Sequence, residues 1–187
     1  MGTGDGLFVY HSARSNPQKF FIGIDANSRP LEKISEKICR KPAKGGLPNA
    51  LFVQSAVEDL PHELNGVASE VFVNFPWGSL LQAVAGGNQM ALANLRLMCS
   101  SDALLRVTLG VDPVRDRAEI ERLDLPVLSA EYIDSTLAEH YRAAGFEIIR
   151  SEWQENSDWA NLGTSWAKRL KENPNRSVVR LTAQVRK

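Results

Sequence analysis

The sequence has little of what metal centres, disulfide-rich scaffolds and membrane spans require. Its 187 residues include two cysteines and three histidines, and neither Cys39 nor Cys99 lies in a CxxC or Cys/His spacing. We therefore expect two structural thiols in a reducing compartment and no metal site. No apolar run approaches the ~18 residues of a membrane span, and no signal peptide, internal repeat or low-complexity tract is visible. These absences predict a cytoplasmic protein that does not associate with membranes.

The chain also has no net charge, because 22 Lys and Arg residues balance 22 Asp and Glu residues. The two signs are nevertheless distributed unevenly. Residues 1–50 hold eight basic and four acidic side chains, and residues 160–187 hold seven basic and one acidic side chain. Residues 51–159, between them, hold seven basic and 17 acidic side chains. Two basic ends that converge in the fold would suit a polyanion such as a nucleic acid. Ordinary solvated faces would produce the same counts, so charge alone leaves both interpretations open.

Apolar runs alternate with amphipathic stretches along the whole chain. The composition, 43% hydrophobic and 24% charged, is typical of one globular domain, which we expect to span residues 1–187. The predicted strands cover residues 19–25, 51–56, 68–74, 103–109, 146–153 and 177–185. The predicted helices cover residues 7–16, 31–41, 80–85, 90–99, 117–123 and 131–144. This order indicates an α/β fold with a mostly parallel sheet, helices on both faces and an antiparallel C-terminal strand pair.

A glycine-rich loop, GTGDG over residues 2–6, stands at the start of the chain. In α/β proteins such a loop joins the first strand to the first helix and holds a nucleotide-like cofactor close to the backbone. Asp25 follows 19 residues after Gly6, where these units place an acid that accepts hydrogen bonds from ribose hydroxyls. Gly-Asp-Gly is equally ordinary turn chemistry, and Asp25 could instead cap a helix.

Two further segments at strand ends are candidates for ligand contact. Glu58 follows the strand expected over residues 51–56, where a carboxylate could meet the polar edge of an adenine or cap a helix. The segment Phe75-Pro76-Trp77 follows the strand over residues 68–74. Open α/β sheets bind their ligands at this carboxyl edge, so a tryptophan there is a candidate contact residue.

Basic residues gather in two stretches. The first follows helical spacing and would form one stripe if the helix persists through its members, which are Lys33, Lys37, Arg40, Lys41 and Lys44. The second surrounds Trp166, which is followed by Lys168, Arg169 and Arg176. An aromatic side chain among cations suits stacking on a base while the phosphate backbone is held. A tryptophan in the core would satisfy the same pattern of hydrophobicity.

Five blocks in this order resemble a known family. They are residues 2–6 (GTGDG), 23–25 (GID), 41–49 (KPAKGGLPN), 75–81 (FPWGSLL) and 165–170 (SWAKRL). Together they resemble the S-adenosylmethionine-dependent 16S rRNA methyltransferases that modify N1 of adenine 1408, the kanamycin–apramycin type of aminoglycoside-resistance enzyme. The resemblance runs from Met1 to the C-terminus, and the combination of the KPxKGGL and FPWG blocks is specific to it.

The resemblance implies a class I S-adenosylmethionine-dependent methyltransferase fold, Rossmann-like, and a role for each matched position. The implied cofactor-binding positions are Gly2, Thr3, Gly4, Asp25, Val57, Glu58, Asn74, Ser79 and Thr164. Trp77 and Trp166 are implied to sandwich the target adenine, with Phe75 and Pro76 beside them. The implied contacts to 16S rRNA of the 30S subunit are Lys37, Arg40, Lys41, Lys44, Arg169 and Arg176. We expect the enzyme to act as a monomer.

The chemistry that the resemblance implies needs few catalytic groups. N1 of adenine carries an in-plane lone pair and can attack a sulfonium methyl group without first losing a proton. No general base is therefore required, and none stands out in the sequence. The enzyme has mainly to extrude the base and to hold N1 in line with the methyl group.

The sequence departs from the family at its start and in one loop. The family's first strand, the Asp that ends it and an N-terminal extension are absent from these residues, and the loop 173–175 is less basic than the family suggests. The first strand is the middle of the sheet in this fold. We therefore expect two strands without their shared neighbour, and a chain that folds poorly or is inactive.

Three other functions fit part of the pattern. A small-molecule methyltransferase would share the glycine loop but gives no reason for two basic ends. A nicotinamide enzyme would use the spacing GxGxxG, whereas the chain has GxGxG. A catalytically dead domain that binds RNA or 30S subunits would retain the basic residues and lose the chemistry.

Overall fold

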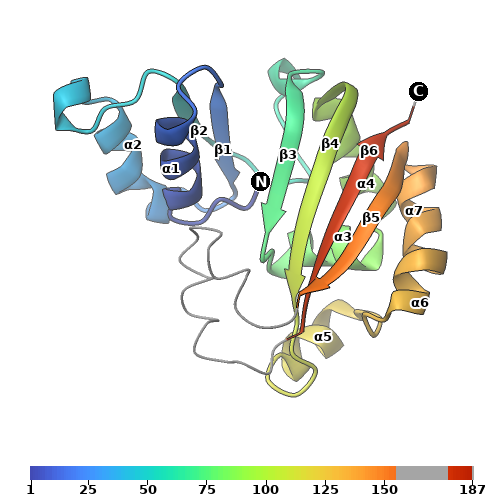
Figure 1. The fold of residues 1–187 in the computed structure, drawn as a ribbon. Coiled ribbons are helices and arrows are strands. Elements are labelled where there is room, and N and C mark those ends of the chain that lie inside the picture. The colour runs from blue at the N-terminus through green and yellow to red at the C-terminus, as the bar shows by residue number, and fades with distance from the viewer. Residues whose placement is uncertain (155–176, 187) are drawn as a thin grey trace.

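The computed structural model describes residues 1–154 and 177–186, and its strands form two separate β-sheets (Figure 1). The strands are β1 Phe21–Asp25, β2 Ala50–Gln54, β3 Ala68–Asn74, β4 Cys99–Gly110, β5 Phe146–Gln154 and β6 Val178–Val185. β1 and β2 form a parallel pair, and the other sheet has the order β3-β4-β6-β5. β3 and β4 are parallel, whereas β6 is antiparallel to both β4 and β5. The predicted antiparallel C-terminal pair is therefore confirmed.

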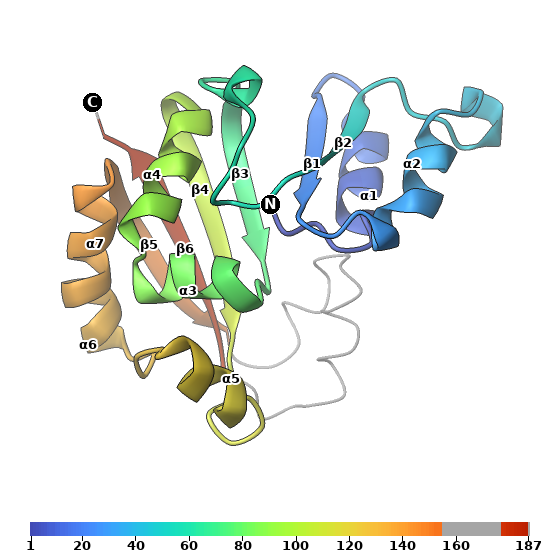
Figure 2. The same cartoon turned by 180° about the vertical axis from the view of Figure 1, so that it is seen from behind.

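The helices lie on both sides of the sheets, as predicted. They are α1 Leu7–Ser15, α2 Glu32–Ile38, α3 Gly78–Gly86, α4 Gln89–Met98, α5 Arg117–Leu123, α6 Ala130–Tyr132 and α7 Ala138–Ala143. A turn of π-helix, Ile133–Leu137, joins α6 to α7, so the helix expected over 131–144 is present as one continuous stretch. α3, α4 and α7 cover the face of the four-stranded sheet seen in Figure 2, and α1 and α2 lie on the opposite side beside β1 and β2.

One helix ends earlier than its sequence pattern suggests. The helix expected over residues 31–41 ends at Ile38, and a short 3-10 turn, Pro42–Lys44, follows. Lys41 is extended, with ψ 146°, because the ring of Pro42 disfavours helical backbone in the residue before it. The predicted basic stripe is therefore broken: Lys33 and Lys37 lie on the helix, whereas Lys41 and Lys44 lie beyond it.

Two hydrophobic clusters form the core of the described residues. The larger lies under the four-stranded sheet and includes Leu105 of β4, Leu92 of α4 and Tyr141 of α7, all fully buried. The smaller joins α1 and α2 to the two-stranded sheet through residues such as Val9 and Ile34. Apolar side chains at helical spacing on α1 and α2 and at alternate positions on β4 account for these buried faces.

β1 and β3 face each other across the boundary between the two sheets, and no strand pairing joins them among the described residues. The expectation of two strands without a shared neighbour is thus confirmed. Side-chain contacts bridge the boundary: the rings of Phe8 and Phe72 lie 5.5 Å apart, and Lys19 Nζ lies 3.4 Å from Glu70 Oε2. The first residues of the chain also enter this boundary, and the candidate site is built around them.

Candidate functional site

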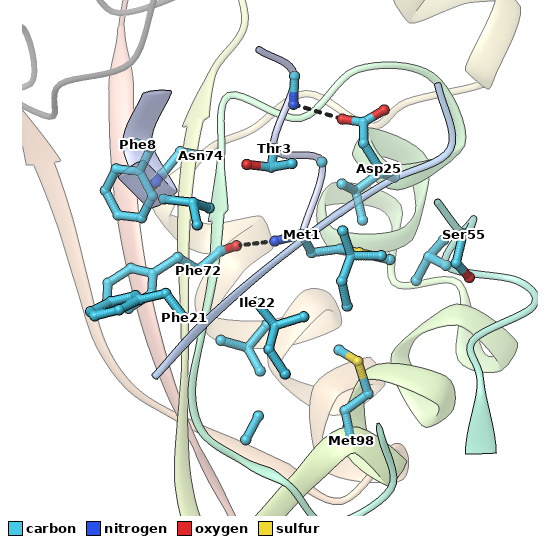
Figure 3. A pocket seen from close by; sticks show the side chains of 18 of the residues that line it. Met1, Thr3, Phe8, Phe21, Ile22, Asp25, Ser55, Phe72, Asn74 and Met98 are labelled. Carbon is cyan, nitrogen blue, oxygen red and sulfur yellow. Dashed lines mark hydrogen bonds between the residues drawn. The ribbon is translucent and has the colours of Figure 1, made fainter. Parts of the chain in front are cut away.

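A cavity of about 940 Å³ opens between the N-terminal loop and the carboxyl ends of β1, β2 and β3 (Figure 3). Its lining includes Thr3 from the loop, Asp25 from β1, Val57 from beyond β2, and Asn74 and Trp77 from the end of β3. The volume lies near the upper end of the range for small-molecule sites, about 300–1,000 Å³. The strand ends have therefore produced a pocket where open α/β sheets bind ligands.

The glycines of the N-terminal loop allow a backbone that other residues would strain. Gly2, Gly4 and Gly6 have φ of 64°, 57° and 72°, all in the left-handed region. A Cβ on Gly2 would also lie 2.6 Å from Leu80 Cδ2. The loop is fixed to β1 by a hydrogen bond from Thr3 N to Ile24 O, 3.1 Å long. These contacts hold the loop against the carboxyl end of β1.

Asp25 ends β1 with its carboxylate beside the loop. Its Oδ2 accepts a hydrogen bond from Gly4 N at 2.7 Å, and its Oδ1 accepts one from Asn27 N at 2.9 Å. An ionised carboxylate offers about four lone-pair sites, so capacity to accept further hydrogen bonds remains. Close by, Thr3 Oγ1 is buried and has no hydrogen-bond partner within the described ranges. An orphaned buried hydroxyl in a pocket is the kind of group that a polar ligand satisfies.

The wall beyond β2 is apolar inside and polar outside. Val57 is buried, whereas Glu58 is exposed at the rim. Asn94 Nδ2 on α4 donates to the carbonyl oxygens of both residues, at 3.0 Å and 3.2 Å. This amide fixes the segment after β2 to the larger core.

The segment after β3 has an unusual backbone. Phe75 has φ 50°, a left-handed conformation that is strained for a bulky residue. Residues in such regions cost roughly 1–3 kcal/mol and cluster at functional sites. Trp77 follows with 48% of its side chain exposed. The strain thus accompanies a large aromatic ring that is presented to solvent at the mouth of the pocket.

Glu119 on α5 braces this segment from outside the sheet. Its Oε1 accepts a hydrogen bond from Gly78 N at 3.2 Å, and the same oxygen lies 2.7 Å from Arg122 Nη2. The hydrogen bond from Arg122 lowers the pKa of the Glu119 carboxyl, although desolvation opposes the shift. The carboxylate is therefore held ionised next to the first amides of α3, where a negative charge is favourable.

The N-terminal nitrogen lies deep in the same pocket. Met1 N donates to Phe72 O of β3 at 2.8 Å (Figure 3). Burial lowers the pKa of this ammonium from 8.0 to about 6, and the negative charge of Asp25 opposes the shift. The loop is therefore attached to β3 as well as to β1.

Comparison with known proteins identifies the fold and the family. A family model described as NpmA, 16S rRNA (adenine(1408)-N(1))-methyltransferase, matches residues 1–185. The chain belongs to this family. It is 37% identical over 191 residues to the 16S rRNA (adenine(1408)-N(1))-methyltransferase of Escherichia coli, a match that covers 100% of this chain and 86% of that protein.

Solved structures of the family agree with the fold. The aminoglycoside resistance methyltransferase NpmB1 is 47% identical, with a TM-score of 0.86 and coverage of 98% of this chain and 84% of that one. A tryptophan-to-alanine mutant of the enzyme from Catenulisporales acidiphilia, solved with cosubstrate SAM, is 34% identical with a TM-score of 0.90. That match covers 100% of this chain and 84% of that one. The predicted methyltransferase fold is confirmed.

The structure brings most of the predicted cofactor positions together. Those that line the one cavity are Gly2, Thr3, Gly4, Asp25, Val57, Glu58, Asn74 and Ser79, and the predicted target-base residues Phe75, Pro76 and Trp77 line it too. Their roles remain predictions. Thr164, Trp166, Arg169 and Arg176 lie outside the described residues.

The four predicted RNA contacts that the structure describes are not among the residues that line the cavity, and they lie on α2 and in the segment that follows it. Arg40, Lys41 and Lys44 are exposed there. Lys37 differs from them, because its Nζ lies 4.1 Å from the centroid of the Tyr10 ring. A cation–π contact of this kind draws the ammonium toward the protein.

The contact of Glu119 with Gly78 was not predicted from the sequence. In the sequence, residues 111–126 have the pattern of a charged insertion, and nothing in their spacing indicates a contact with Gly78, which lies 41 residues before Glu119.

Among the described residues, no group of three His, Cys, Asp or Glu side chains could hold a metal ion, and no helix is long and apolar enough to cross a membrane.

Proposed function

We propose that this chain transfers the methyl group of S-adenosylmethionine to N1 of adenine 1408 in 16S rRNA, within the 30S ribosomal subunit, and thereby confers aminoglycoside resistance. Membership of the family supports the reaction and the target. The observation that carries the proposal is one continuous cavity that runs from Asp25 and Val57 to the exposed ring of Trp77. Such a cavity offers a nucleoside-type pocket and a stacking surface within reach of each other.

The residues of the inner pocket fit the cofactor. Asp25 retains lone pairs for ribose hydroxyls, Val57 offers an apolar wall to an adenine, and Thr3 Oγ1 lacks a partner among the described residues. We assign Gly2, Thr3 and Gly4 to the methionine end, where the absence of side chains on the glycines permits close approach. When bound, S-adenosylmethionine supplies a methyl group on a sulfonium centre.

The residues at the mouth of the cavity position the target adenine. Because N1 of adenine has a free lone pair, the protein does not need to remove a proton from it. Extruding the base from its stack costs a few kcal/mol, and one aromatic stacking contact returns roughly 1–3 kcal/mol. Trp77 is placed to make that contact, and Glu119 holds the backbone that carries it. Trp166 stays the predicted second face of the sandwich.

The basic residues would dock the enzyme without reading sequence. Arg40, Lys41 and Lys44 offer exposed charge, and Arg169 and Arg176 are the predicted C-terminal contacts. Contacts of this kind are made to phosphates, so the affinity for 30S subunits should fall steeply as salt rises. We propose that one monomer binds one subunit, which analytical ultracentrifugation of the free protein and of the complex can test.

Primer extension across 16S rRNA from expressing cells tests the function. Methylation at N1 blocks the Watson–Crick edge, so reverse transcriptase should stop beside adenine 1408. The stop and resistance to kanamycin and apramycin should disappear in Trp77→Ala. They should persist in Trp153→Ala, which removes a ring of similar exposure, 42%, on β5 outside the cavity lining.

Calorimetric titration with S-adenosylmethionine separates the alternatives. Cofactor binding together with the stop supports the proposal. Cofactor binding with no stop on 30S subunits would indicate a methyltransferase for another substrate. Binding of 30S subunits without cofactor binding would indicate a catalytically inactive RNA-binding domain.

A further inference from the structure

The basic residues after α2 lie on a segment whose two ends are joined. α2 ends at Ile38, and Leu47 N donates back to Ile38 O at 2.9 Å, so residues 39–46 form a closed loop. A Cβ on Gly46 would collide with Arg40 O, which shows how closely the two sides of the loop pass. In Figure 1 this loop, drawn in cyan, lies beyond α2 on the side of the molecule away from the four-stranded sheet. We call residues 39–46 the basic loop, because it exposes Arg40, Lys41 and Lys44.

The hydroxyl of Tyr10 on α1 attaches the basic loop to the smaller hydrophobic cluster. Tyr10 Oη donates to Gly45 O at 3.2 Å, across 35 residues of the chain. Gly45 directly follows Lys44 and ends the 3-10 turn with a left-handed φ of 86°. Tyr10 itself is only 4% exposed, since its ring packs in the cluster that α1 and α2 share. The hydrogen bond therefore joins the exposed loop to a side chain that the core holds in place.

The ring of the same tyrosine holds Lys37. Lys37 Nζ lies 4.1 Å from the ring centroid, and the side chain is half-buried. An aromatic face attracts a cation, and the contact restricts a side chain that otherwise has many rotamers. The ring uses none of the N–H donors of the ammonium, so these remain for an anion. Tyr10 thus fixes one basic side chain on α2 by its ring and the backbone of the basic loop by its hydroxyl.

The positive charges around Tyr10 are not neutralised by neighbouring carboxylates. None of the ion pairs within residues 1–154 and 177–186 involves Lys37, Arg40, Lys41 or Lys44. A group of unpaired cations on one surface attracts a polyanion such as a phosphate backbone. Where such cations are already held in one arrangement, binding costs less ordering of side chains and loops.

We propose that Tyr10 is a positioning residue for the docking of this chain on 16S rRNA. It would not touch the RNA, because it is buried. Instead, its hydroxyl would fix the basic loop and its ring would fix Lys37, so that the cations are in place before the 30S subunit arrives. This inference rests on the proposed function, and it concerns the binding of the subunit rather than methyl transfer.

Tyr10→Phe in the full chain is the main test, because it removes the hydroxyl and keeps the ring beside Lys37. In the free protein, exchange of the Gly46 and Leu47 amides should become faster. Equilibrium binding of 30S subunits should weaken roughly threefold to tenfold, as expected for one lost hydrogen bond. The KM for 30S subunits should rise and kcat should not change. Calorimetry should find the affinity for S-adenosylmethionine unchanged, since Tyr10 does not line the cavity.

Tyr132→Phe is the matched control. Tyr132 Oη donates to Ala85 O at 3.0 Å, so this change also removes one hydrogen bond between a tyrosine and a backbone carbonyl. The bond lies in the larger cluster, away from the basic loop. Both variants should lose stability to a similar extent in urea denaturation, but only Tyr10→Phe should weaken the binding of 30S subunits.

A double-mutant cycle tests the contact of the ring with Lys37. Lys37→Met should weaken the binding of 30S subunits in the parent chain. In the Tyr10→Leu background, where the ring is absent, the same change should cost less by roughly twofold or more. Equal losses in the two backgrounds would show that the ring does not position the ammonium. If Tyr10→Leu fails to fold, the comparison of Tyr10→Phe with Tyr132→Phe decides the proposal alone.

The remaining outcomes separate this proposal from the proposed function. Unchanged binding of 30S subunits by Tyr10→Phe would overturn the positioning role and leave the function intact. Equal weakening by Tyr132→Phe would assign the effect to general stability and would also overturn it. If the parent chain binds 30S subunits without methylating them, the proposed function fails and the same pair of variants still decides the docking role. If the parent chain does not bind the subunits, both proposals fail.

Discussion

The two sheets differ in how much they depend on each other. In the four-stranded sheet, β4 and β6 are each paired on both edges, and Leu105 and Phe146 are fully buried. Within residues 1–154 and 177–186, neither strand of the two-stranded sheet is paired on both edges. Phe20, just before β1, is 58% exposed, and Leu51 of β2 is 36% exposed. A lone strand pair is marginally stable in water unless other elements support it. We call β1, β2, α1 and α2 the N-terminal unit. Its stability therefore depends on the packing of the two helices on the strand pair and on its contacts with β3 across the boundary.

The candidate site spans this boundary. Thr3 and Asp25 lie on the side of the two-stranded sheet, whereas Asn74 and Trp77 lie on the side of the four-stranded sheet. A ligand that contacts both sides should stabilise their association, since it binds the docked arrangement and not the separated one. Cofactor binding should accordingly protect the N-terminal amides more than those of β4 and β6.

The largest effect that we expect is on the free energy of unfolding, and it should differ between the larger and the smaller hydrophobic cluster. Leu105→Ala should lower the free energy of unfolding by about 2–5 kcal/mol, because the site is fully buried in the larger cluster. Ile34→Ala, in the smaller cluster, should instead open the N-terminal unit locally. Urea denaturation and NMR amide exchange measure both. Loss of protection in β4 and β6 on Ile34→Ala would show that the two sheets unfold as one unit.

The next effect is a pH dependence from the Met1 ammonium. Its pKa is about 6 in the folded chain and 8.0 as an ordinary N-terminus, because burial disfavours the charge. Between these values the unfolded chain binds more protons, so stability rises with pH and gains roughly 2 kcal/mol from about pH 6 to pH 8. Urea titrations at each pH should show this gain. N-terminal acetylation removes the titrating group and should flatten this part of the profile, and a gain toward acid would contradict the assignment.

A smaller effect is expected from alanine substitutions at two glycines with positive φ, which together distinguish the cost of a steric contact from the cost of backbone strain. Gly2→Ala should weaken S-adenosylmethionine binding and destabilise the chain, because its Cβ would lie 2.6 Å from Leu80 Cδ2 in addition to a φ of 64°. Gly66→Ala is the matched control, with φ 70° and nothing within 4 Å of its Cβ. Strain alone costs roughly 1–2 kcal/mol, so both should lose that much, and the excess in Gly2→Ala measures the contact. Calorimetry should find cofactor affinity unchanged in the control.

The smallest effect on stability concerns the brace under Trp77. Glu119→Ala should reduce methylation several-fold with little change in unfolding, because Gly78 N loses its acceptor at the start of α3. Glu121→Ala, on the same helix, removes an exposed partner of Arg117 and should leave methylation intact. Single-turnover methylation of 30S subunits measures both variants. Equal rates for the two would show that the brace does not orient the tryptophan.

Local patterns in the sequence predicted most of the fold. The helix Arg117–Leu123 and the strand Ala68–Asn74 have the predicted bounds, and the helix before Asn16 ends where Asn16-Pro17 interrupts it. Periodicity and glycine or proline breaks act over a few residues, so they can be read without the tertiary structure. The resemblance of short blocks to a family likewise selected the cavity-lining residues of the loop and the strand ends.

The sequence by itself determined the elements, their order and the chemistry gathered at the carboxyl ends of β1, β2 and β3, because these follow from local propensity and from where parallel strands end. The tertiary structure decided the left-handed backbone at Phe75 and the contact of Glu119 with Gly78. It also turned Lys37 toward Tyr10. These features depend on groups far apart in the chain, whose meeting is set by the packing of whole elements and leaves no local pattern in the sequence.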